Sequence, residues 1–164
     1  MDRVMVEAGG LDLAALQQAF LRERQPRYGA FLAFSGLVRQ IGGVAPHEGN
    51  SPIVAIEYEM YHALFVQATL GLIGDVRGRL LGNLGPVTIV HREDVVPLGE
   101  PTIAVMLLAV HHEEALAAMQ ALLAGIREKI PFWKRLIRKD GTRSLSAPQS
   151  NGHPVTFPNH RFSH

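Results

Sequence analysis

The chain has 164 residues, of which 47% are hydrophobic and 19% are charged, as in globular domains and unlike disordered segments. Its net charge of +1 excludes an overall positive field that would recruit nucleic acid or a membrane, and its lack of cysteine excludes disulfides, thiolate metal sites and a cysteine nucleophile. The sequence shows neither a signal peptide nor an apolar run long enough to span a bilayer. We therefore expect a cytoplasmic protein with one domain over residues 1–147 and an irregular tail over residues 148–164.

The first half of the chain predicts two helices and two strands. Leucines and phenylalanine recur at helical spacing before Pro26, and Gly36 within the first strand indicates a bulge or a close approach of the backbone. Glycines and prolines over residues 40–52 predict a loop. The expected elements are a helix over 11–26, strands over 29–39 and 53–60, and a long helix over 61–81.

The second half predicts a strand-rich segment around one further helix. Pro131 ends that helix because its ring blocks the helical turn and it has no N–H to donate. The expected elements are turns at 85–86, 97–99 and 140–141, strands over 87–92, 102–110 and 143–146, a helix over 112–130 and an extended piece over 132–137. Helices and strands that mix without regular alternation indicate an α+β fold.

Cationic and titratable side chains cluster at the ends of these elements, where sites are usually assembled. Arginine holds phosphate through a two-pronged fork, and lysine offers a charge whose pKa can be lowered. Together with the single tryptophan, these residues predict an anion pocket with an aromatic wall. They are Arg39, His111, His112, Arg127, Trp133, Lys134 and Arg135.

Each of these residues also has a simpler interpretation. Arg39 is then a solvated strand end, Arg127 an ordinary helix-dipole partner and Trp133 a core residue. Glu57 and Glu59 share a strand face and are better explained by solvation than by acid–base chemistry. The histidines of the tail lack ligand spacing, so we expect no metal site.

Six segments, taken in order, resemble the large, catalytic subunit of molybdopterin synthase. They are GAFLAFSGLVR at 29–39, IEYEMY at 56–61, IVHREDVVPLGE at 89–100, AVHHEEAL at 109–116, IPFWKR at 130–135 and DGTR at 140–143. The resemblance implies an α/β-hammerhead fold with a mixed or antiparallel sheet packed by helices, and a homodimer within a heterotetramer. Its partners would be thiocarboxylated ubiquitin-like small subunits, which would transfer sulfur to cyclic pyranopterin monophosphate and form the dithiolene of molybdopterin. No cofactor is implied.

The resemblance also assigns roles to individual residues. Lys134 and Arg127 match catalytic positions, although the family usually has lysine at the position of Arg127. An arginine there can hold phosphate but cannot readily give up a proton. His112 stands where the family usually has arginine. The substrate-binding positions are Phe34, Leu37, Val38, Arg39, His111, His112, Arg127, Lys134, Arg135, Leu136 and Arg143.

Two alternative functions remain open at the level of sequence. Arg127 and His112 are compatible with a diverged family member that binds the small subunit or the pterin but catalyses weakly or not at all. A nucleic-acid-binding module would explain Trp133 beside Lys134 and Arg135, but the near-neutral charge argues against it.

Overall fold

The computed structural model describes residues 1–40 and 51–145, and within them it has three helices and seven strands. The helices are α1 (Leu13–Arg22), α2 (His62–Arg79) and α3 (His112–Lys129). The strands are β1 (Arg3–Ala8), β2 (Ala30–Leu37), β3 (Ile53–Glu59), β4 (Leu84–Pro97), β5 (Pro101–Ala109), β6 (Trp133–Arg138) and β7 (Arg143–Leu145).

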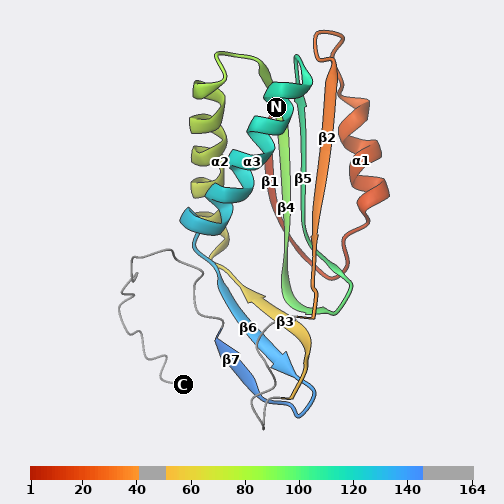
Figure 1. Cartoon of the computed structure of the whole chain (residues 1–164), viewed down its shortest axis with the longest axis vertical. Helices are drawn as coiled ribbons and strands as arrows, with labels where there is room; N and C mark the ends of the chain where they lie inside the picture. Colours follow the sequence, from red (N-terminus) through yellow and green to blue (C-terminus); the bar gives the residue numbers. More distant parts are fainter. Residues whose placement is uncertain (41–50, 146–164) are drawn as a thin grey trace.

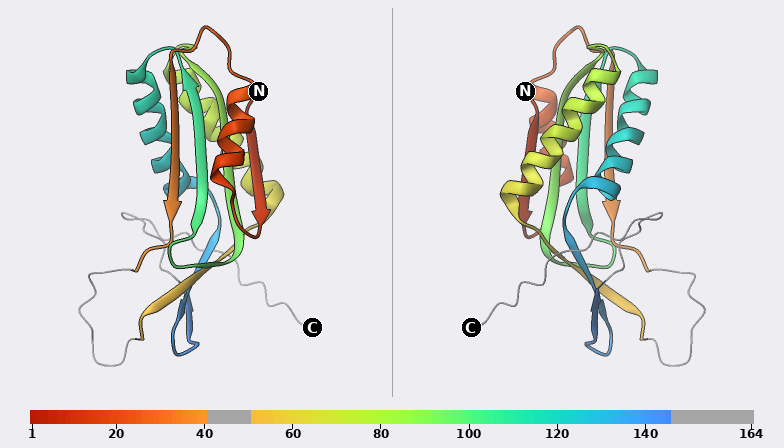
Figure 2. Two further views of the ribbon diagram at one scale, coloured as in Figure 1. Left: turned by 90° about the vertical axis from the view of Figure 1, so that its right-hand side faces the viewer. Right: turned by 90° about the vertical axis from the view of Figure 1, so that its left-hand side faces the viewer.

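The strands form one sheet in the order β2-β5-β4-β3-β6-β7, with β1 paired to β4. The β1–β4 pair is parallel and the other pairs are antiparallel, so the sheet is mixed. Helices α2 and α3 cover one face and α1 covers the other, while β3, β6 and β7 extend beyond the helices (Figures 1 and 2). This arrangement confirms the expected α+β fold with a mixed sheet packed by helices.

The long strand β4 links the two parts of the sheet. Its residues 88–93 pair with β1, whereas residues 94–97 pair with β3. The change of partner occurs at Asp94, which has a left-handed φ of 76°. Such a conformation is uncommon outside glycine and bends the strand locally. The bend directs β3, and β6 beside it, away from the helical layer (Figure 1).

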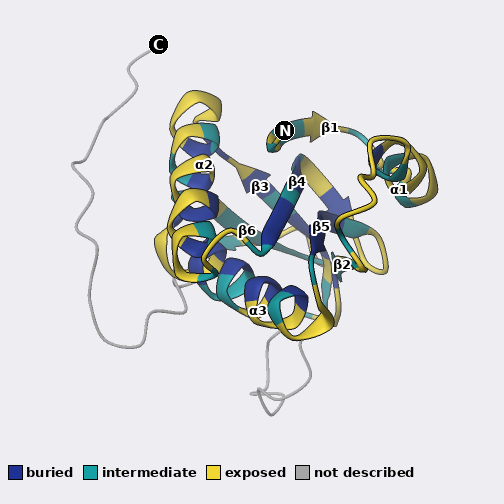
Figure 3. Cartoon of the chain, turned by 90° about the horizontal axis from the view of Figure 1, so that it is seen from above, coloured by how far each residue is buried: buried dark blue, intermediate teal, exposed yellow. Residues whose placement is uncertain are grey.

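The main core lies between the sheet and the pair α2 and α3. Phe65 and Ile73 of α2 and Leu122 of α3 are fully buried against the central strands, and the buried sides of both helices face the sheet in the view from above (Figure 3). Gly125 allows the two helices to approach closely, because a Cβ there would lie 2.4 Å from Cδ1 of Leu72. A smaller cluster around Phe20 packs α1 on the opposite face.

The helix ends follow the expected local chemistry. The Asp12 side chain accepts a hydrogen bond from the N–H of Ala15 at 2.9 Å and so caps α1. Helix α3 ends at Lys129, just before Ile130 and Pro131, as the proline predicted. The bulge expected at Gly36 is also confirmed, because the β2–β5 register shifts between Gly36 and Leu37.

Two features differ from the sequence-based prediction. The predicted turn at 85–86 is wrong, because β4 already begins at Leu84 and passes through a register shift before Val87. Pro86 is tolerated at this irregularity. Gly85 serves close packing, since a Cβ there would lie 2.7 Å from the ring of Tyr28. Strand β1 was not predicted, because its pairing with β4 joins residues about 85 positions apart and has no local signature.

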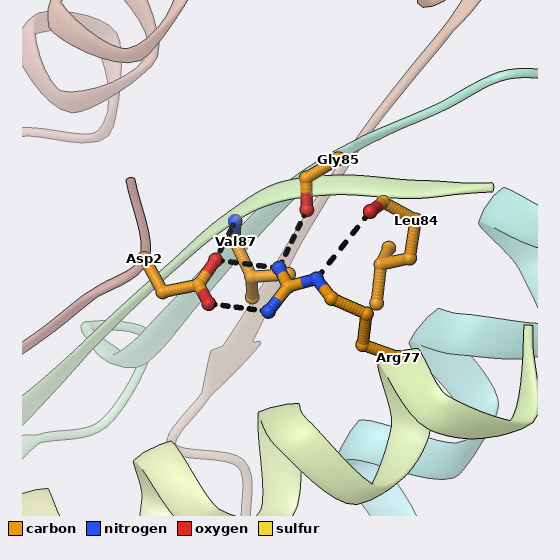
Figure 4. A network of polar contacts seen from close by, with 5 residues as sticks. All are labelled: Asp2, Arg77, Leu84, Gly85 and Val87. Carbon is orange, nitrogen blue, oxygen red and sulfur yellow. Dashed lines mark hydrogen bonds and ion pairs between the residues drawn. The ribbon is translucent and has the colours of Figure 1, made fainter. Parts of the chain in front are cut away.

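The start of β1 is held by a network around Arg77 of α2 (Figure 4). The Arg77 guanidinium donates to both carboxylate oxygens of Asp2, at 2.6 and 2.7 Å, and to the carbonyl of Gly85 at 2.8 Å. Asp2 also accepts from the N–H of Val87 at 3.0 Å. The network therefore ties the N-terminal segment to both α2 and β4.

The loop predicted over 40–52 lies mostly outside the described residues, and the tail predicted over 148–164 lies wholly outside them. None of the described helices is long and apolar enough to cross a membrane.

Candidate functional site

Lys134 lies on β6, directly opposite Tyr58 of β3. Tyr58 is buried, and its ring contacts those of His91 and Phe132, with centroids 5.1 and 6.1 Å away. Burial lowers the pKa of the Lys134 amine, and the positive charge of Arg39 lowers it further. The structure thus brings two predicted site residues, Lys134 and Arg39, into one electrostatic environment.

The segment that carries Arg39 is fixed by the turn between β4 and β5. The N–H of Val38 donates to the carbonyl of Glu100 at 3.0 Å, and the N–H of Gly99 donates to the carbonyl of Val38 at 2.8 Å. Val38 is buried, whereas Leu37 and Arg39 on either side of it are exposed. Phe34, three residues before Leu37 on β2, is also partly exposed. The end of β2 therefore presents one cation and two apolar side chains on a rigid backbone.

Arg127 lies in the last turn of α3, and its exposed guanidinium is 3.5 Å from the carboxylate of Glu128. The chain then passes Pro131 and enters β6, which carries Lys134. Leu136 lies two residues further along, on the same strand face as Lys134, and packs against the main core. Arg127 and Lys134 are thus carried by adjoining elements.

Arg135 and Arg143 lie on the opposite face of this part of the sheet. Side chains alternate along β6, and Arg135 faces Glu57 rather than Tyr58. Glu57 is 3.4 Å from Arg135 and 3.1 Å from Arg143, and Glu59 is 2.9 Å from Arg135. The Glu57 side chain is only 19% exposed, so this strand face is a network of ion pairs and not simply a solvated surface. Within one chain, the structure does not bring Arg135 and Arg143 together with Lys134.

His111 and His112 lie at the other end of α3. The 18 residues of this helix place its two ends about 27 Å apart, at 1.5 Å per residue (Figure 1). Both histidines are exposed and line a pocket of about 630 Å³ with Gly29, Ala30, Val110, Glu113 and Glu114. His112 lies 3.2 Å from Glu113. Within one chain, the two histidines therefore lie far from Lys134.

Sequence reasoning assigned no role to three aromatic residues, Tyr58, Phe65 and His91. His91, Phe65 and Phe132 form ring contacts with centroids 5.2 to 5.6 Å apart, and Tyr58 completes the cluster. Burial lowers the pKa of His91 to about 4, although a hydrogen bond to the carbonyl of Arg92 opposes this effect. The segments IEYEMY and IVHRED contain two of these residues, but only the tertiary structure brings Tyr58 and His91 into contact.

The described residues contain no group of three or more His, Asp or Glu side chains placed to hold a metal ion. The charged group that acts on Lys134 is instead a cation, Arg39, and two cations together suit an anionic ligand.

Comparisons with known proteins give consistent matches. The family model described as MoaE protein matches residues 6–129. The molybdopterin synthase catalytic subunit of Cereibacter sphaeroides is 28% identical over 149 residues, which cover 91% of this chain and 94% of that protein. The structure of molybdopterin cofactor biosynthesis protein E from Burkholderia multivorans is 27% identical with a TM-score of 0.70, and the match covers 93% of this chain and 92% of that one. The complex of subunits 1 and 2 of molybdopterin-converting factor from Helicobacter pylori shares the fold, with a TM-score of 0.71 at 20% identity over 93% of this chain and 94% of that one.

Proposed function

Because the chain belongs to the MoaE protein family, we propose that it is the catalytic subunit of molybdopterin synthase. In this role it transfers sulfur from a thiocarboxylated small subunit to cyclic pyranopterin monophosphate and so forms the molybdopterin dithiolene. The observation that carries the proposal is the match to the MoaE family over residues 6–129, and the partly buried Lys134 amine, on which the charge of Arg39 acts, supports it.

Lys134 and Arg39 have complementary roles in this proposal. A lysine amine with a lowered pKa exchanges protons more readily near neutral pH than an ordinary lysine. It would move protons at the reacting centre and stabilise the charge that develops there. Arg39 keeps its positive charge and would bind the substrate phosphate through its guanidinium fork. Leu37 and Phe34 would supply apolar contacts to the pterin.

A homodimer would supply the two histidines. His111 and His112 lie at the start of α3, whose two ends are about 27 Å apart, whereas the chain reaches Lys134 only after the end of this helix, so one chain is not expected to bring them to the same ligand. In the proposed dimer, the histidines of one copy complete the pocket around Lys134 of the other. Arg135 and Arg143, which lie on the opposite sheet face from Lys134, would likewise reach substrate only through the assembly.

Mixing two inactive variants tests this arrangement. Lys134→Ala and His111→Ala are each expected to retain no more than about 1% of wild-type activity as homodimers. After denaturation and joint refolding, mixed dimers would contain one intact site, and activity would return to about a quarter of the wild-type value. No recovery in mixtures that contain mixed dimers would contradict a shared site.

The partner is a ubiquitin-like small subunit whose C-terminal thiocarboxylate reaches Lys134, and the proposed compartment is the cytoplasm.

Reconstitution with a thiocarboxylated small subunit and cyclic pyranopterin monophosphate tests the function. Wild-type protein should form the dithiolene product, and Lys134→Ala should lower the rate by about 10²- to 10⁴-fold, as expected for loss of a proton-transfer group. Lys134→Arg is the matched control that keeps the charge. Failure of the wild type to form product under any condition would rule the function out.

A further inference from the structure

Arg92 of β4 is a buried arginine that the proposed chemistry does not use. It is 8% exposed, and its Nη2 donates to the carbonyl of Val95 at 3.3 Å. Its Nη1 lies 3.9 Å from the carboxylate of Glu100. Among the described residues, Nε and Nη1 have no hydrogen-bond partner. A buried guanidinium with unpaired N–H groups destabilises the fold. A contribution to stability therefore does not explain why Arg92 occupies this position.

Arg92 sits where β4 changes partner. The residues up to Glu93 pair with β1, and the residues from Asp94 onward pair with β3. Val95, which accepts the hydrogen bond from Arg92, lies beyond this bend, and Glu100 lies in the turn that leads to β5. Arg92 itself precedes the bend, and its guanidinium contacts two residues beyond it, so the side chain spans the bend.

The two parts of the sheet that meet at this bend carry the two cations of the site. On one side, β4 pairs with β5 and β5 pairs with β2, and Arg39 lies two residues after the end of β2. On the other side, β4 pairs with β3, and β3 pairs with β6, which carries Lys134. A small change at the bend would thus move Arg39 and Lys134 relative to each other.

We propose that Arg92 is a positioning residue, which fixes the bend of β4 and the β4–β5 turn and thereby sets the distance between Arg39 and Lys134. It acts through Glu100 and Val95 and does not touch substrate. This role rests on the proposed function, because its purpose is to align the two cations for one phosphate-bearing ligand. Positions matter here, since a displacement of about 1 Å in an active site can lower a rate by about 100-fold.

The first test follows the distance between Arg39 and Lys134 through the titration of Lys134, without any assay of activity. The chain has only three lysines, Lys129, Lys134 and Lys139, so reductive ¹³C-methylation gives few amine resonances to titrate by NMR. In Arg92→Leu, the pKa of Lys134 should rise toward that of ordinary lysine, because Arg39 moves away. Lys129 and Lys139 are exposed, and their resonances serve as internal references.

Arg77→Leu is the matched control for loss of stability. Arg77 also makes partly buried hydrogen bonds, but to Asp2, Leu84 and Gly85, away from the bend. It should lower the melting temperature without changing the titration of Lys134 or kcat/KM. Arg92→Leu should lower kcat/KM by about 10- to 100-fold, and Arg92→Lys should recover part of this loss because it keeps the charge.

The outcomes separate the two proposals. If Arg92→Leu leaves both the titration and kcat/KM unchanged, or if Arg77→Leu alters them equally, the positioning role is wrong. If Arg92→Leu does not fold, Arg92→Lys and Glu100→Gln carry the same readouts, and unchanged values in both also overturn it. If the wild type forms no product, the proposed function fails, while the titration still decides the role of Arg92.

Discussion

Arg39, just beyond the end of β2, lies close enough to Lys134 of β6 for its charge to add to the larger effect of burial on the lysine pKa. The two residues are 95 positions apart in the sequence and come from different parts of the sheet. An amine in such surroundings loses its proton more easily than a solvated lysine. This pair is the centre of the proposed site.

Removing the charge of Arg39 should raise the pKa of Lys134. A neighbouring cation disfavours the protonated amine, so Arg39→Met removes that repulsion while keeping an unbranched side chain. The measurement is the NMR titration of the ¹³C-methylated lysines. Arg135→Met is the control, because Arg135 lies on the opposite face of β6. A Lys134 titration that responds equally to both substitutions would show that Arg39 has no specific effect.

Arg127→Lys distinguishes a working enzyme from a diverged, weakly active one. In the proposed function Lys134 carries the proton transfers and Arg127 supplies only charge from the exposed last turn of α3. Restoring the lysine should therefore change kcat by less than about tenfold, or about 1.4 kcal/mol in activation free energy. A much larger gain would indicate that the arginine impairs catalysis and would favour a diverged, weakly active family member. Lys129→Arg, two residues further along, is the control.

Asp2→Ala should destabilise the protein, because it leaves the partly buried Arg77 without its carboxylate partner (Figure 4). We expect a loss of about 1–3 kcal/mol in the free energy of unfolding at pH 7. Glu23→Gln is the control, since its pair with Arg3 is exposed and such pairs contribute about 0–1 kcal/mol. Denaturant unfolding of both variants measures the difference, and equal losses would contradict it.

The same pair predicts a dependence on acid. Burial raises the pKa of Asp2, but hydrogen bonds from Arg77 and Val87 outweigh burial and lower it below 3.8 overall. The stabilisation is therefore complete above pH 3.8 and is lost as the pH falls through the lower pKa of the folded state. The Asp2→Ala variant should lose less stability than the wild type below pH 3.8.

His91 predicts a second loss of stability in acid, at a higher pH than that of Asp2. Burial lowers its pKa from 6.5 to about 4, so the unfolded chain binds a proton in this range and the folded chain does not. Stability should be complete above pH 6.5 and fall by up to about 3 kcal/mol as the pH approaches 4. His91→Phe should flatten the profile between these values, whereas substitution of the exposed His62 should not. Unfolding free energies measured from pH 7 to 4 decide this, and parallel profiles for wild type and His91→Phe would contradict it.

Gly125→Ala should destabilise the contact between α2 and α3. The added Cβ would lie 2.4 and 2.7 Å from the two terminal carbons of Leu72, so that side chain must move within a packed core. We expect a loss of about 1–3 kcal/mol. Gly74→Ala is the matched control on α2, because nothing lies within 4 Å of its new Cβ, and it should stabilise by about 0.4–1 kcal/mol. Thermal unfolding measures both, and the opposite order would show that the interface is loosely packed.

The sequence by itself determined most of the elements and the chemical character of the site. Pro131 ends α3, Gly36 marks the bulge in β2, and the alternation over residues 53–60 indicates β3, because each depends on local backbone geometry. The cations at element ends also predicted an anion pocket before any contact was known. These signals are local, so they can be read from neighbouring residues alone.

The tertiary structure decided which of those residues share a site. Strand pairing placed Lys134 opposite Tyr58 and turned Arg135 toward Glu57 on the other face, and the fold brought Arg39 close enough for its charge to act on Lys134. The length of α3 separated His111 from Lys134. Strand β1 and the bend at Asp94 likewise depend on pairing between distant segments. Such pairing is set by packing across the whole fold, which no local sequence pattern encodes.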